Sequence, residues 1–90
     1  MTAPEALRQA LVLAGISQAA LARETGLTAK HINQIFMGKA PMSVDVAIRL
    51  ERILPAISAE DLMVAQVRSQ VQAMRALRYE DRELSRTPPV

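Results

Sequence analysis

The sequence predicts an all-α fold of five helices, with the longest helix at the C-terminal end, and three observations support this prediction. Half of the 90 residues are hydrophobic, and most of these are Ala, Leu, Val, Ile and Met. Apolar residues recur at helical spacing, and no stretch alternates apolar and polar residues as a half-buried strand does. Ser or Thr precedes the periodic segments and Gly or Pro follows them, as caps and stops of helices do.

The first helix is expected to begin after Thr2 and to end before Gly15. Thr2 and Glu5 have the spacing of a capping box, and Pro4 falls in the first turn, where proline is tolerated. Gly15 is a residue that commonly closes a helix in the left-handed conformation. The residues expected on the buried side lie at i, i+4 and i+7, namely Leu7, Leu11 and Ala14.

Two short helices follow, separated by a tight turn. Ser17 caps the second helix, which is expected to end near Thr25, and Thr28 caps the third, which is predicted over residues 29–37. Gly26 lies between them and adopts a positive φ without steric cost. Small Ala22 allows the two helices to cross closely, and the residues expected to point inward are Leu21, Leu27, Ile32, Ile35 and Phe36.

The fourth helix is expected between Ser43 and Pro55, and a fifth between Ser58 and Tyr79 or beyond. Val46, Ala47, Leu50 and Ile53 keep helical spacing in the fourth. The chain is therefore divided into a domain over residues 1–55, a C-terminal helix over 56–84 and a flexible tail over 85–90.

Composition excludes several classes of function. The chain has no cysteine, so it forms no disulfide and no thiolate metal site, and its single histidine excludes a multi-histidine metal centre. No nucleophile and carboxylate accompany His31 in a catalytic pattern, so we expect no catalytic residue, no cofactor and no enzymatic activity. No apolar run reaches the roughly 18 residues of a membrane span, and no basic leader is present, so we expect a cytoplasmic protein.

The distribution of charge gives a weak indication of a nucleic-acid partner. The formal net charge is +2. Residues 1–55 contain six basic and four acidic residues, whereas residues 56–90 contain five of each, so the surplus lies in the first part of the chain. Lys30 and Lys39 flank most of the third helix.

The segment from Gln18 to Met37 resembles the large helix-turn-helix family of phage repressor and Cro proteins, the XRE family. The resemblance covers roughly residues 5–54 and implies a lambda-repressor-like domain that binds double-stranded DNA. The matching positions are Ser17, Gln18, Leu21, Ala22, Gly26, Leu27, Thr28, Ile32, Ile35 and Gly38.

A narrower stretch is similar to the HigA branch of antitoxins. The similarity includes Gly38-Lys39, Met42-Ser43 and the segment from Ala47 to Leu50, and continues to Gln66, with Leu62 where that branch has a tryptophan. This resemblance implies a second reading, in which the protein binds a toxin and also represses its own operon.

The family resemblance implies which residues contact DNA. By this resemblance, the third helix is the recognition helix and would lie in the major groove. Residues expected to contact bases are Ala29, Lys30, Asn33 and Gln34, and residues expected to contact phosphates are Gln18, His31, Lys39 and Ser43. The alternative is that Lys30, Asn33 and Gln34 form an ordinary solvated face. Arg49 is interpreted as a surface charge, with an ion pair or a phosphate contact as the alternative.

The fifth helix contains an apolar stripe of Val64, Val67, Val71 and Met74 at alternating spacings of three and four. This spacing is typical of a coiled-coil seam, so the stripe predicts a contact with a second copy or another protein. The alternative is that the stripe folds back on the N-terminal core. The sequence therefore favours a repressor that acts as a homodimer on a palindromic operator, with the toxin-binding antitoxin as the alternative.

Overall fold

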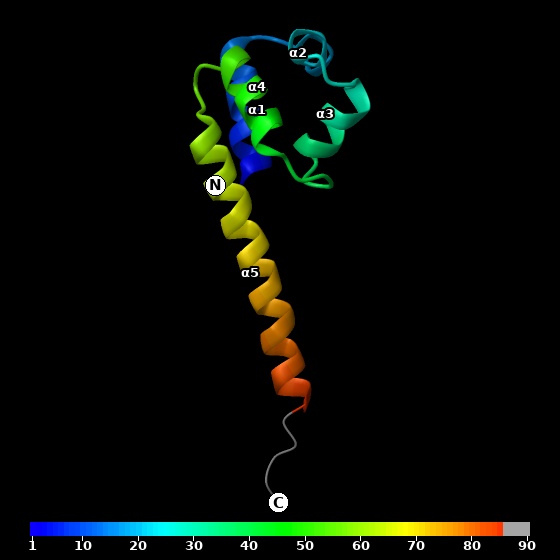
Figure 1. Ribbon diagram of the computed structural model, residues 1–90, viewed down its shortest axis with the longest axis vertical. Coiled ribbons are helices and arrows are strands. Elements are labelled where there is room, and N and C mark those ends of the chain that lie inside the picture. Colours follow the sequence, from blue (N-terminus) through cyan, green and yellow to red (C-terminus); the bar gives the residue numbers. More distant parts are fainter. Residues whose placement is uncertain (86–90) are drawn as a thin grey trace, which may run out of the picture.

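The computed structural model describes the chain over residues 1–85, and its side chains over residues 1–79. It confirms the all-α fold: this part of the chain forms five helices, α1 (Ala3–Ala14), α2 (Gln18–Thr25), α3 (Ala29–Phe36), α4 (Val44–Ile53) and α5 (Ala59–Ser85) (Figure 1). The third helix ends one residue earlier than predicted. The predicted flexible tail lies, from residue 86 onward, outside the described residues.

A hydroxyl side chain caps the N-terminus of each helix, as the sequence predicts. Thr2, Ser17, Thr28, Ser43 and Ser58 each accept a hydrogen bond from the backbone N–H three residues later, at 3.0–3.3 Å. At α1 the capping box is complete, because the Glu5 carboxylate also accepts from the Thr2 N–H. These local bonds satisfy N–H groups that the helix itself leaves unpaired, so they fix where each helix begins.

The core is formed where α1 to α4 surround one another and the first turns of α5 complete the enclosure (Figure 1). Helix α1 packs against α3 and α5, α2 packs against α3 and α4, and α4 packs against α5. The largest fully buried side chains are Leu7, Leu21, Ile32, Ile35, Phe36, Leu50, Leu54 and Leu62. Leu62 lies in α5, so the start of that helix belongs to the domain.

The predicted buried side of α1 is partly wrong. Leu7 is fully buried, but Leu11 is half-buried and Ala14 is exposed. Ala3 and Ala10 complete the buried side instead. Ala14 lies one turn beyond Ala10 on the same side. It is the last residue of the helix, however, and is exposed because no core residue covers that end.

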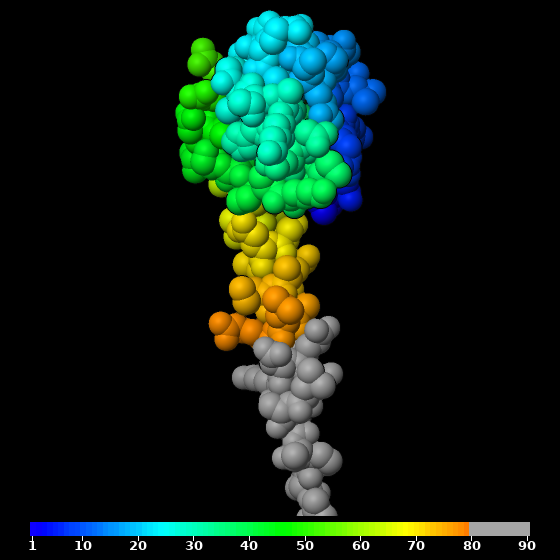
Figure 2. Space-filling model, turned by 90° about the vertical axis from the view of Figure 1, so that its right-hand side faces the viewer, coloured from blue at the N-terminus to red at the C-terminus, as the bar shows by residue number. Residues whose placement is uncertain are grey.

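Beyond its first turns, α5 leaves the domain as a projecting helix (Figures 1 and 2). Every residue from Val67 to Tyr79 is exposed. The apolar stripe of Val64, Val67, Val71 and Met74 is 38–53% exposed and does not fold back on the core. The described chain accordingly measures 62 × 22 × 21 Å.

A pair of matched substitutions in α1 tests this core. We expect Leu7→Ala to lower the free energy of unfolding by about 2–5 kcal/mol, because it removes a fully buried side chain and leaves a cavity. Leu13→Ala is the control, because the Leu13 side chain is 71% exposed and its truncation should change stability by less than about 0.5 kcal/mol. Urea denaturation at one fixed protein concentration measures both. Equal effects of the two substitutions would contradict the described packing of α1.

Candidate DNA interface

The turn between α2 and α3 is short and closed by backbone hydrogen bonds. Gly26 follows α2 in the left-handed conformation, with φ 74° and ψ 15°. The Leu27 N–H donates to the Ala22 carbonyl at 3.1 Å, and Thr28 then caps α3 by accepting from the His31 N–H at 3.0 Å. A residue with a Cβ is strained at such a φ, so glycine is the natural choice at this position. These features build a helix-turn-helix over residues 18–36.

A polar contact from α4 supports the end of α2. The buried Thr25 hydroxyl donates to the Leu21 carbonyl at 2.7 Å, and the Thr25 carbonyl accepts from Arg49 Nη1 at 3.3 Å. Arg49 Nε also lies 3.1 Å from the Asp45 carboxylate, one turn earlier in α4. Arg49 is exposed, as expected of a surface charge, and it also forms the ion pair that was the alternative interpretation. The guanidinium also places a positive charge at the carbonyl end of α2, where the helix dipole favours it.

Helix α3 has one buried and one open side. Ile32, Ile35 and Phe36 are at most 2% exposed, as predicted. The helical period places Lys30 and Gln34 opposite this buried side, with Lys30 exposed and Gln34 half-buried. Asn33 is exposed beside them, and Ala29 is exposed in the first turn, one turn before Asn33. Of the four residues predicted to contact bases, Lys30, Asn33 and Gln34 therefore share the open surface of α3, and Ala29 lies at its margin.

The residues predicted to contact phosphates are more scattered. Lys39 and Ser43 are exposed in the α3–α4 loop, residues 37–43, which lies directly beneath α3 in Figure 2. Gln18 is half-buried at the first position of α2. His31 is half-buried at the edge of the buried side of α3, one turn before Gln34 and Ile35 and between the two. The loop residues thus adjoin the open surface of α3, whereas His31 lies to its side.

Two side chains, Arg8 and Gln66, position this surface through long-range hydrogen bonds that no local sequence pattern indicates. Arg8 of α1 donates to the Phe36 carbonyl at 2.7 Å, across 28 residues, and so satisfies the C-terminal end of α3. Gln66 of α5 makes two hydrogen bonds to the backbone of Met42 in the α3–α4 loop. Such contacts join segments far apart in the chain, and neither capping patterns nor apolar periodicity indicates them.

Over the described residues, the structure shows neither a grouping of His, Asp and Glu that could hold a metal ion nor a helix long and apolar enough to cross a membrane. The open surface of α3 offers hydrogen-bond donors and acceptors on a short helix, which is the chemistry that reads base edges in the major groove. It contains no nucleophile paired with a base.

Comparison with known families agrees with this geometry. The model of the helix-turn-helix family matches residues 7–62, which is more than half of the chain. The chain therefore belongs to the XRE-type helix-turn-helix family, and its function is that of a DNA-binding regulator. No curated protein and no solved structure matches it. The matched segment ends at Leu62, the last buried residue of the described core, so the projecting part of α5 lies beyond the matched domain.

Proposed function

We propose that this protein is a transcriptional repressor that binds a palindromic operator as a homodimer. In this proposal residues 1–55 contact DNA, and the helix over residues 56–84 joins two copies. The observation that supports it best is the exposed apolar stripe on α5, together with the open polar surface of α3. Repression requires no further chemistry, because a dimer bound across a promoter excludes the polymerase.

The second copy is the partner that best fits the stripe. Val64, Val67, Val71 and Met74 extend along one side of a helix whose 27 residues span about 40 Å. All four are between 38% and 53% exposed, and exposed apolar surface of this kind usually marks an interface. A stripe with the period of a coiled-coil seam is matched by the same stripe of another copy, so two α5 helices would cover each other.

Within this dimer, Lys30 and Gln34 would read bases. Lys30 donates to guanine O6 or N7, and Gln34 pairs with the edge of adenine. Ala29 suits a thymine methyl, and Asn33 is placed beside them for a further base contact. Lys39 and Ser43 in the α3–α4 loop, with Gln18 and His31 at the edges, would contact phosphates and set the orientation of the domain.

The antitoxin reading uses the same stripe for a different protein. It is favoured by the similarity of residues 36–51 to the HigA branch, and it keeps the same contacts of α3 with DNA. A gene for a small basic ribonuclease-like toxin next to this one would favour it. Light scattering separates the two readings: the repressor is a dimer by itself, whereas an antitoxin that uses the stripe for its toxin is a monomer until that toxin is added.

A binding site selected from random duplexes tests the function as a whole. We expect a two-fold symmetric site with half-sites about one helical turn apart, roughly 34–36 Å, because paired recognition helices must reach the same side of the duplex. Footprinting on the selected duplex measures this spacing. A single asymmetric half-site would argue against the dimer.

Substitutions on α3 and in the α3–α4 loop should have different effects on DNA binding. Lys30→Ala and Gln34→Ala should each cost about 1–3 kcal/mol on the selected site and relax the base preference there. Lys39→Ala should weaken binding evenly across sequences and lower the salt slope by about one, because it removes a phosphate contact. Titrations on the selected and on scrambled duplexes at several salt concentrations measure both. If Lys39→Ala changed sequence preference and Lys30→Ala did not, the assignment of base contacts would be wrong.

A charge in the stripe should separate the dimer. We expect Val67→Asp or Val71→Asp to give a folded monomer, because both positions are exposed in the single chain and become buried only between copies. Operator affinity should fall by more than any one base contact contributes, since each half-site alone makes few contacts. Light scattering and a titration measure these effects. Gln72→Asp is the control, because it places the same charge at an exposed position on another side of α5. A Val67→Asp protein that stays dimeric, or a monomer with full affinity, would remove the stripe from the mechanism.

A further inference from the structure

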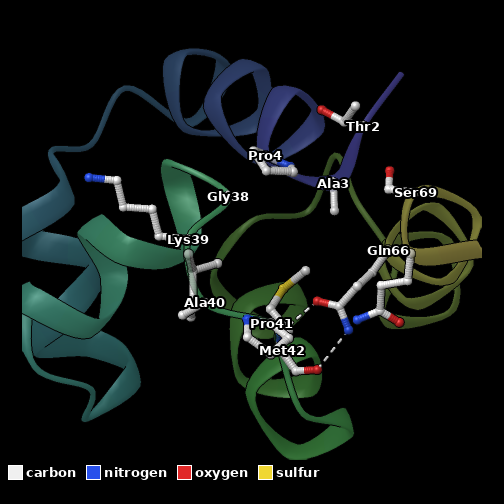
Figure 3. A pocket seen from close by; sticks show the side chains of 12 residues that line it. Thr2, Ala3, Pro4, Gly38, Lys39, Ala40, Pro41, Met42, Gln66 and Ser69 are labelled. Carbon is white, nitrogen blue, oxygen red and sulfur yellow. Dashed lines mark hydrogen bonds between the residues drawn. The ribbon is translucent and has the colours of Figure 1, made fainter. Parts of the chain in front are cut away.

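The side chain of Gln66 in α5 makes two hydrogen bonds to the α3–α4 loop. Gln66 Oε1 accepts a hydrogen bond from the Met42 N–H at 2.6 Å, and Gln66 Nε2 donates to the Met42 carbonyl at 2.9 Å (Figure 3). The two residues are 24 positions apart in the chain. They lie at a groove of about 390 Å³ between the start of α1, the loop and α5. One backbone residue of the loop is therefore paired on both its polar groups by α5.

This pairing requires an amide side chain of this length. A glutamine offers one acceptor oxygen and one donor nitrogen, which match a backbone N–H and carbonyl together. Glutamate has no donor for the carbonyl, methionine has neither group, and asparagine is shorter by one methylene. The two partners also fix which end of the amide is oxygen, because the amide oxygen must face the Met42 N–H and the amide nitrogen must face the Met42 carbonyl.

Met42 stands directly before Ser43, the residue that caps α4. Ser43 Oγ accepts from the Val46 N–H at 3.2 Å, so its hydroxyl hydrogen remains available to donate to another group. At the other end of the loop, the Lys39 N–H donates to the Gln34 carbonyl of α3 at 2.8 Å. The Gln66 side chain thus fixes the end of the loop that α3 does not. Of the two predicted phosphate contacts, Lys39 is itself bonded to α3, and Ser43 directly follows Met42.

We propose that Gln66 is a positioning residue for DNA binding, which holds the α3–α4 loop so that Lys39 and Ser43 meet the phosphates together. The inference rests on the proposed function, because it assigns the loop to the DNA. Gln66 immediately precedes Val67 of the apolar stripe, so the part of α5 that a second copy would pack against also anchors the loop. Pairing of the α5 helices and phosphate binding are then linked, and each strengthens the other.

The test compares matched substitutions one turn apart on α5. Gln66→Met keeps the length of the side chain and removes both hydrogen bonds. Gln70→Met is the control, because Gln70 lines the same groove and is exposed, and the structure shows it making no hydrogen bond to the loop. The probes are a short labelled duplex of mixed sequence and the duplex that the unsubstituted protein selects from a random library. Each is titrated at several salt concentrations.

We expect Gln66→Met to bind both duplexes more weakly, roughly threefold to tenfold, since it loses hydrogen bonds that orient the loop. The salt slope should fall by about one, because a phosphate contact is lost with the loop position. Gln70→Met should match the unsubstituted protein in both. Hydrogen exchange should accelerate at the Met42 amide in Gln66→Met only, while light scattering and thermal melting show the same oligomer and an intact helical domain at the temperature used.

Gln66→Glu provides a second variant if Gln66→Met does not fold. It keeps the acceptor for the Met42 N–H, but its other oxygen faces the Met42 carbonyl, and Gln70→Glu controls for the added charge. Unchanged affinity and salt slope in the Gln66 variants would overturn the positioning role and leave the proposed function in place. A weaker affinity with an unchanged slope would also overturn it, since the loss would then lie elsewhere than at phosphates. If the unsubstituted protein bound neither duplex, the proposed function itself would be wrong.

Discussion

The candidate DNA interface depends on the burial of one side of a very short helix. Helix α3 has eight residues, a length at which an isolated helix is not stable in water. Ile32, Ile35 and Phe36 are buried against the rest of the core, and this burial, with the Thr28 cap and the Arg8 bond to the Phe36 carbonyl, holds the helix in place. The open side of α3 can therefore be polar without cost to the fold, and its residues are free to be selected for what they contact.

The need for buried apolar side chains also explains why the domain includes the start of α5. A chain of this size has a thin margin of stability, so each buried side chain matters. Ala59 and Leu62 are buried in the core, and the Ala59 N–H donates to the Glu51 carboxylate of α4. Residues 63–66 still contact the domain on one side, and from Val67 to Tyr79 every residue of the helix is exposed. The change from buried to exposed along one uninterrupted helix separates the part that stabilises the domain from the part that is available to others.

Local sequence patterns predicted the five helices, but they did not predict the hydrogen bonds between residues far apart in the chain. The five caps were read correctly because each involves a side chain and an N–H three residues apart, and the inner side of α3 followed from its period. Ala14 was misjudged because periodicity shows which side a residue lies on, not how far the core extends along that side. The bonds of Arg8 and Gln66 span 28 and 24 residues, and only the tertiary arrangement brings those groups together.

These long-range bonds tie the open surface to different parts of the molecule. Arg8 connects the end of α3 to α1, inside the domain, so its effect depends only on the fold of the single chain. Gln66 connects the α3–α4 loop to α5, at the point where that helix becomes exposed. The position of the loop therefore depends on how firmly α5 is held. A free helix that projects into water opens and frays more readily than one packed against another helix. Ordering α5 from outside would therefore order the loop as well, without any movement of α3. If α3 and the loop contact DNA as proposed, the α3 contacts depend on the core of the single chain, whereas the loop contacts also depend on α5.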